Sequence, residues 1–145
     1  MENRGKRVIG SYMENYEITV INLNTQEAQI LPIEVDEAEK TEYIVIKSVF
    51  LGKEISATDY NYLAAYQKFR DKLQEFGYGI KCNGSRINAV QSGMMGATDK
   101  VYLIELGKQA LMKDIAYIWD FPDIEEFPNT EQQKDVATGL STDYA

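Results

Sequence analysis

The side chains best suited to chemistry are gathered in residues 81–107, KCNGSRINAVQSGMMGATDKVYLIELG. Ser92 could act as a nucleophile only if a base took its proton, and the chain contains no histidine. Lys100 is the base that a Ser–Lys arrangement would use, so this possibility stays open. Without histidine there is no imidazole general base, and with Cys82 as the one cysteine there is no Cys/His zinc site. We therefore expect no cofactor and no metal site.

The glycines of this stretch do not match a phosphate-binding loop. Neither the Walker pattern G-x-x-x-x-G-K-S/T nor the dinucleotide pattern G-x-G-x-x-G is present. Strands are predicted on both sides, so no helix N-terminus would face an anion. We expect the glycines to shape two turns, at positions that need positive φ or close backbone approach. The turns would present a candidate contact loop made of Arg86, Ser92, Gly93 and Met94.

Carboxylates offer a second route to catalysis. Two acidic side chains on neighbouring strands can share acid–base work, as in glycoside hydrolysis. Glu105 and Asp120 lie at the ends of two predicted strands, but the sequence does not fix the distance between them. A carboxylate-dependent hydrolase is the least favoured hypothesis, and we predict that the protein is not an enzyme.

Charge is the strongest compositional signal. The chain has 23 acidic and 15 basic residues, a net charge of −8. Such a surface repels nucleic acid and anionic lipid, and it attracts basic proteins. Acidity for solubility alone is the simpler alternative. No apolar run approaches the roughly 20 residues of a membrane helix. The single cysteine fits a reducing compartment, so we expect a cytoplasmic protein without membrane contact.

Aromatic and acidic residues follow one another near the C-terminus, in the segment 117–126. Aromatic anchors inside a charged rim are typical of protein interfaces. This C-terminal edge is the candidate interface for a basic protein partner. Its residues are Tyr117, Trp119, Asp120, Asp123, Glu125 and Glu126, with Phe121 between them.

The first third of the chain reads as an antiparallel meander of three strands. Its β-branched, alternating segments are residues 16–23, 28–35 and 43–51. Pro32 lacks a backbone donor, so the second strand is expected at a sheet edge or to end near this residue. Four further strand-like segments follow later in the chain, at residues 78–82, 87–90, 101–106 and 115–121.

One long helix is predicted over residues 56–79. Ser56 followed by Asp59 resembles a capping box, and aromatic and leucine residues recur at three- and four-residue steps. Gly77 would end the helix in the left-handed conformation. The apolar stripe is expected to pack on the sheet.

The predicted fold class is α+β, with a mostly antiparallel sheet against one long helix in the order β-β-β-α-β-β-β. Residues 1–128 would form a single domain. Residues 129–145 are acidic and poorly periodic, and they are expected to form a flexible tail.

Parts of this pattern resemble a loosely defined group of small uncharacterised bacterial proteins. The likeness spans roughly residues 52–121 and includes a Cys-x-Gly step, a Ser-Gly-Met step and a Tyr-x-Leu strand. Members commonly have proline before Ser-Gly-Met, where this chain has Gln91. No activity is implied, although small acidic bacterial proteins are often immunity factors that neutralise toxins, an analogy only. The matching residues are Arg70, Gly77, Cys82, Gly84, Val90, Ser92, Gly93, Met94, Tyr102 and Asp120.

Three functional hypotheses follow from these observations. The first is an interaction protein that binds a basic partner such as a toxin or nuclease domain. The second is a homo-oligomeric module, a homodimer for example, joined through an exposed strand edge or sheet face. The third is the carboxylate-dependent hydrolase.

Overall fold

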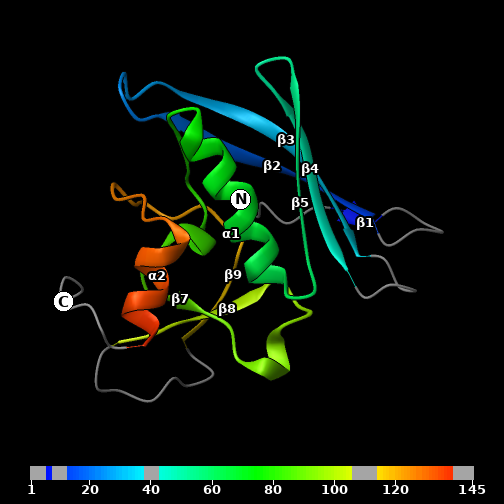
Figure 1. Ribbon diagram of the computed structural model, residues 1–145, viewed down its shortest axis with the longest axis vertical. Helices are drawn as coiled ribbons and strands as arrows, with labels where there is room; N and C mark the ends of the chain where they lie inside the picture. Colours follow the sequence, from blue (N-terminus) through cyan, green and yellow to red (C-terminus); the bar gives the residue numbers. More distant parts are fainter. Residues whose placement is uncertain (1–5, 8–12, 38–42, 106–113, 139–145) are drawn as a thin grey trace.

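The computed structural model describes residues 6–7, 13–37, 43–105 and 114–138 (Figure 1). It is an α+β structure in which a curled antiparallel sheet carries a helix on one face, and a small sheet and a second helix lie beyond it. No helix within these residues is long and apolar enough to cross a membrane. The main sheet contains β1 (Lys6–Arg7), β2 (Met13–Asn22), β3 (Ala28–Glu37), β4 (Ile44–Phe50), β5 (Lys53–Asp59) and β6 (Tyr78–Ile80).

The predicted meander is confirmed. Strands β1 to β5 lie side by side in sequence order. Strand β6 pairs with the C-terminal end of β2, on the same edge of β2 to which β1 pairs near the N-terminal end. Strands β2, β3 and β4 alternate buried and exposed residues, so one face belongs to the core and the other is open. This alternation is why the sequence identified β2, β3 and β4.

The β4–β5 hairpin corrects the predicted helix start. Residues 53–59 were expected partly in the helix, but they pair with β4 along its full length. Leu51 and Gly52 form the two-residue connection and both have positive φ, as a type I′ turn requires. The Ser56–Asp59 spacing therefore lies inside a strand, and the capping-box prediction is wrong.

Pro32 does not lie at a sheet edge. Strand β3 is central, between β2 and β4. Its pairing with β4 begins at Glu34 opposite Lys47 and does not include Pro32. The Ser48 hydroxyl donates to the Pro32 carbonyl at 2.8 Å, which satisfies an acceptor where the backbone ladder stops. A side chain thus allows a proline in a central strand, where it is normally excluded.

Helix α1 (Tyr62–Glu75) packs on the core face of the sheet and is shorter than predicted. Asn61 is its N-cap residue, and Phe76 its C-cap. Gly77 follows with φ of +83°, which confirms its predicted role as the left-handed residue after the helix. The predicted apolar stripe is confirmed as core for its four central members, Leu63, Tyr66, Phe69 and Leu73, whereas its end members Tyr60 and Phe76 are exposed.

The C-terminal half has shorter strands than the sequence predicted, and it contains a helix that the sequence did not predict. Helix α2, beyond residue 128, is a second helix that the predicted order lacks. It lies against α1 and β7, and buries Gln133 and Val136, so the expected tail is corrected for residues 129–138. Residues 139–145 lie outside the described part. The remaining elements are η1 (Asn83–Ser85), β7 (Ala89–Val90), η2 (Gly93–Met95), β8 (Lys100–Leu103), β9 (Ile115–Tyr117) and α2 (Thr130–Ala137).

Candidate binding surfaces

Cys82 belongs to the core. It has no exposed surface, and burial, followed by the charge of Asp120, raises the pKa of its thiol. Ser85 is also fully buried and shares a hydrogen bond with the Tyr66 hydroxyl. Burial likewise raises the pKa of Tyr66 above the usual tyrosine range. These groups stay protonated and out of contact with solvent, so their arrangement serves packing.

Two glycines of the 81–107 stretch allow close approach, as predicted. A Cβ on Gly84 would lie 2.9 Å from side-chain atoms of both Ile118 and Tyr66. A Cβ on Gly96 would lie 2.7 Å from the Asn61 side-chain oxygen. The other expected reason, positive φ, does not apply to the described glycines of this stretch, since Gly52 and Gly77 are the glycines that have it.

The Gln91 side chain connects residues 95–100 to the N-terminus of α1 through hydrogen bonds. Its side-chain oxygen accepts from the Leu63 backbone N–H at 2.9 Å, so it caps the first turn of α1. Its amide nitrogen lies within 3.2 Å of the backbone oxygens of Met95, Thr98 and Lys100. One amide group therefore holds residues 95–100 against the N-terminus of α1. Sequence reasoning missed this role.

The predicted contact loop is split by the structure. Ser92, Gly93 and Met94 are exposed together at η2, and 98% of Met94 is accessible. A hollow of about 350 Å³ lies beside them, lined by Ser92 and Gly93 and by residues at the start of α1. Arg86 lies elsewhere, half-buried at the end of η1, where its Nε donates to Asn83.

Trp119 corrects the prediction for the C-terminal edge. It was expected as an interface anchor, but it has no exposed surface. Its ring packs against those of Tyr16 and Tyr66, with centroids 5.4 and 5.2 Å away, and its Nε1 donates to the Tyr62 hydroxyl at 2.8 Å. Trp119 is therefore the centre of the aromatic core between α1 and the sheet.

The other residues of the C-terminal edge remain accessible. Asp123, Glu125 and Glu126 are exposed, and Tyr117 and Asp120 are half-buried. A hollow of about 300 Å³ brings the two glutamates together with Arg86. A second basic group also lies at this acidic edge, because the Lys81 Nζ is 5.8 Å from the ring of Phe121. The same hollow is lined further by Ile87, Asn88 and Ile124.

Arg70 and Gln133 form a buried polar cluster that sequence reasoning did not find. Arg70 is fully buried, pairs with Asp71 at 2.8 Å and donates to Gln133 at 2.8 Å. The Gln133 amide nitrogen donates to the backbone oxygens of Gly84 and Arg86. The cluster joins α1, α2 and η1. The one available signal was Arg70, which interrupts the apolar stripe of the helix.

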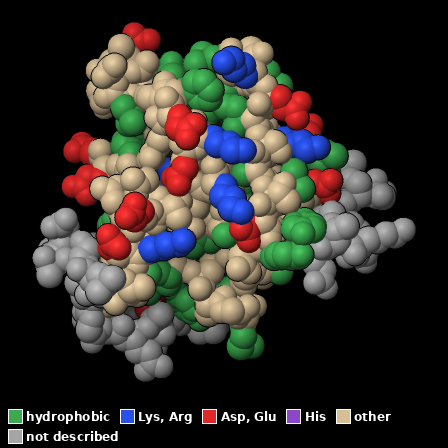
Figure 2. All heavy atoms as spheres, viewed as in Figure 1, with side chains coloured by type: hydrophobic (Ala, Val, Ile, Leu, Met, Phe, Trp, Pro, Cys, Tyr) green, Lys and Arg blue, Asp and Glu red, His purple; other side chains and the backbone are tan. Residues whose placement is uncertain are grey.

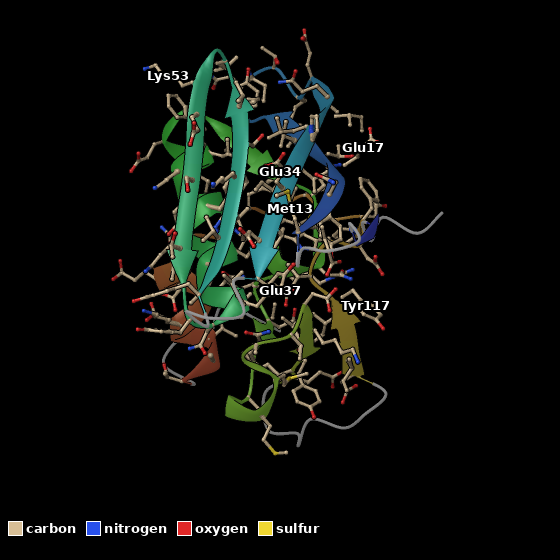
Figure 3. All side chains as sticks on the ribbon, turned by 90° about the vertical axis from the view of Figure 1, so that its right-hand side faces the viewer. Met13, Glu17, Glu34, Glu37, Lys53 and Tyr117 are labelled. Carbon is tan, nitrogen blue, oxygen red and sulfur yellow. The ribbon has the colours of Figure 1, made fainter. Side chains whose placement is uncertain are left out.

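The open face of the main sheet is a surface that the sequence did not single out. Register places Glu17 of β2 opposite Pro32 of β3, and Val49 of β4 opposite Glu54 of β5. The β3–β4 ladder stops at Glu34 opposite Lys47, two residues short of Pro32 and Val49. On either side of this place, one pair therefore joins a carboxylate to an exposed apolar residue: Glu17 with Pro32, and Glu54 with Val49. Figure 3 shows this face, with Glu17 and Glu34 labelled on it.

The open face contains exposed apolar side chains. Val49 is 67% exposed, and Ile30, two residues before Pro32 on the same face, is 58% exposed. Leu51, in the adjoining hairpin turn, is 61% exposed and holds a positive φ of 52°. Such a conformation is uncommon and strained for a residue with a side chain like leucine. We call this surface the open-face patch: Ile30, Pro32, Val49 and Leu51, with Glu17, Glu34 and Glu54 around them.

The face that carries α1 has a different character. Figure 2 shows its basic and acidic side chains interspersed. Lys68 pairs with Asp59 at 2.9 Å and donates to the Thr58 carbonyl, and Lys72 donates to the Ser56 carbonyl. Because these carbonyls belong to edge strand β5, the two lysines cover positions where another strand would pair.

Comparison with known proteins gives no assignment. Within the described ranges, no cluster of three or more metal-ligating side chains is present. No model of a known protein family matches the chain, and no curated protein matches it in a sequence search.

Proposed function

We propose that the protein is an interaction protein that binds a basic protein partner. The observation that carries this proposal is the open-face patch, where exposed apolar side chains lie among carboxylates. Interfaces combine an apolar centre with a polar rim, and an exposed apolar patch rimmed by polar residues is a frequent mark of an interaction site. The net charge of −8 favours a cationic partner and speeds the encounter.

The narrower proposal is an immunity-type inhibitor in the cytoplasm of a bacterium, with a basic toxin or nuclease as the partner. Its support is the charge and size of the chain together with the analogy to small acidic bacterial proteins. This version adds a requirement, namely that binding must abolish the partner's own activity at equal molar amounts.

The test is affinity capture with the full-length protein in cells that express it naturally, with washes at low and then high salt. We expect a stoichiometric basic protein whose recovery falls at high salt, because salt screens exposed charge pairs. The purified partner should bind in calorimetry with a Kd that rises with salt. The proposal fails if only acidic proteins, or none, are recovered, or if binding is indifferent to salt.

The homo-oligomer is the second candidate, and the same open face favours it. Pairing between two copies of the patch would bring Glu17 and Glu54 of both copies close together, which opposes association at low salt. Light scattering at high protein concentration decides between the two. A dimer that persists at low salt would support the module and count against a cationic partner.

A further inference from the structure

We infer that the open-face patch is the docking surface, and that its occupant is a partner segment with apolar side chains between two basic groups. This rests on the proposed function and goes beyond it, because it chooses one surface and states the layout of the partner. The rival surface is the C-terminal edge around Phe121 and Glu125.

Charge layout favours the open face. Glu17 lies opposite Pro32 and Glu54 lies opposite Val49, and neither carboxylate makes an ion pair or hydrogen bond within the described part of the chain. Glu34 lies opposite Lys47, so a residue of opposite charge is its direct cross-strand neighbour. At the C-terminal edge, by contrast, Arg86 shares the hollow with the acidic residues.

The strand order also sets the layout of the partner. Strands β3 and β4 lie between β2, which carries Glu17, and β5, which carries Glu54. A partner that satisfies Glu17 and Glu54 together must present two Lys or Arg groups, one over β2 and one over β5, which long flexible side chains can reach. Apolar side chains between them would cover Pro32 and Val49.

Docking is on the face of the sheet, not by strand addition at the β5 edge. Lys68 and Lys72 already occupy two outward carbonyls of β5, at Thr58 and Ser56. An added strand would have to displace both lysines, whereas the face requires no rearrangement.

Leu51 gives a further argument. Asn-Gly is the preferred pair for a type I′ turn, yet this turn has Leu-Gly with leucine in the left-handed region. The leucine is mostly exposed, so its side chain brings little core packing in return for the strain. A contact with the partner at the end of the patch would account for its presence.

The experiment places a photo-crosslinking amino acid, p-benzoyl-L-phenylalanine, at one position at a time in the full-length protein, in cells that express it naturally. Val49 reports on the open face, Phe121 on the C-terminal edge, and Glu75 on the exposed end of α1. We expect a crosslink to a basic protein from Val49 alone. A crosslink only from Phe121 overturns this inference but keeps the proposed function. No crosslink to a basic protein from any position overturns both.

Charge reversal then measures how much the two carboxylates contribute to affinity. The partner that the crosslink identified is purified in its free form for this measurement. Glu17→Lys with Glu54→Lys should raise Kd at least tenfold at low salt, and less at high salt. The matched control is Asp123→Lys with Glu126→Lys, which changes the net charge equally but leaves the open face intact. Equal weakening by both pairs would mean only general electrostatic attraction and would overturn the inference.

Leu51→Asn separates binding from folding. Removing the strain should raise the midpoint of thermal unfolding, and removing the apolar contact should raise Kd severalfold. A stabilised variant that binds as tightly as the original would exclude Leu51 from the interface. A variant that loses stability would contradict the turn argument itself.

Discussion

At the scale of single residues, the side-chain amides of Gln91 and Gln133 connect separate elements, although neither residue belongs to a recognisable sequence pattern. Gln133 is the more deeply buried of the two. Gln133 accepts from Gln67 and Arg70 and donates to the oxygens of Gly84 and Arg86. Each polar atom of the amide is therefore used twice, inside a site with almost no solvent exposure. A buried polar group is costly when its partners are lost, which makes this residue more important than its type suggests.

Gln133→Ala should lower the free energy of unfolding by about 3 kcal/mol, because Arg70 and two backbone oxygens lose buried partners. Lys134→Ala, one residue further along α2 and exposed, is the matched control and should change it by less than about 0.5 kcal/mol. Urea unfolding followed by tryptophan fluorescence measures both, since Trp119 is the single tryptophan. Equal effects of the two substitutions would show that the cluster contributes little.

At the scale of elements, the sequence predicted those strands and helices whose buried residues recur at a regular spacing. Strands β2, β3 and β4 and the apolar stripe of α1 were identified because their burial follows periods of 2 and 3.6 residues. Strand β5 was missed because its residues 56–59 imitate a helix start and Leu51 is not a usual turn residue. Helix α2 is short, and such helices depend on tertiary packing, which no local pattern reports.

Glycine conformation gives a test at the end of α1. Gly77→Ala should lower the free energy of unfolding by about 1–2 kcal/mol, since its φ of +83° is strained for an L residue although the space is open. Gly93→Ala should leave the free energy unchanged or raise it by up to about 1 kcal/mol, because an added Cβ there meets nothing within 4 Å and φ is not positive. Thermal unfolding of the two variants side by side checks the opposite signs. Similar losses at both sites would contradict this account.

At the scale of the whole molecule, the chain divides its ionisable groups between two environments. Tyr62, Tyr66 and Cys82 are buried in one aromatic core, and burial raises the pKa of all three side chains. The acidic residues of the open-face patch and of the C-terminal edge lie outside it. Stability at alkaline pH and binding of a basic protein partner are therefore expected to depend on different residues.

Stability should fall at alkaline pH. In the unfolded chain the thiol ionises near pH 8.5 and the tyrosines near about pH 10, while the folded protein keeps all three protonated. The folded state then binds more protons, so stability is complete below about pH 8.5 and falls by about 1.4 kcal/mol per pH unit for each group above its unfolded pKa.

Urea unfolding at pH values from about 8 to about 11 measures this decline. Cys82→Ala is the internal control, because it removes the group with the lowest unfolded pKa and should move the onset from about pH 8.5 to about pH 10. A flat stability over this range would mean that the buried groups ionise in the folded protein.

The sequence by itself determined the fold class, the meander, the core stripe of α1, the role of Gly77 and the charge, because these depend on composition and on local periodicity. The tertiary structure decided which side chains are available. It placed Trp119 in the core, brought Arg86 to Glu125 and Glu126, and set Glu17 opposite Pro32 and Val49 opposite Glu54. The physical reason is that strand register and packing between elements make neighbours of residues that are distant in the sequence, as for Val20 and Ile80 or for Tyr16 and Trp119, and no local pattern reports such contacts.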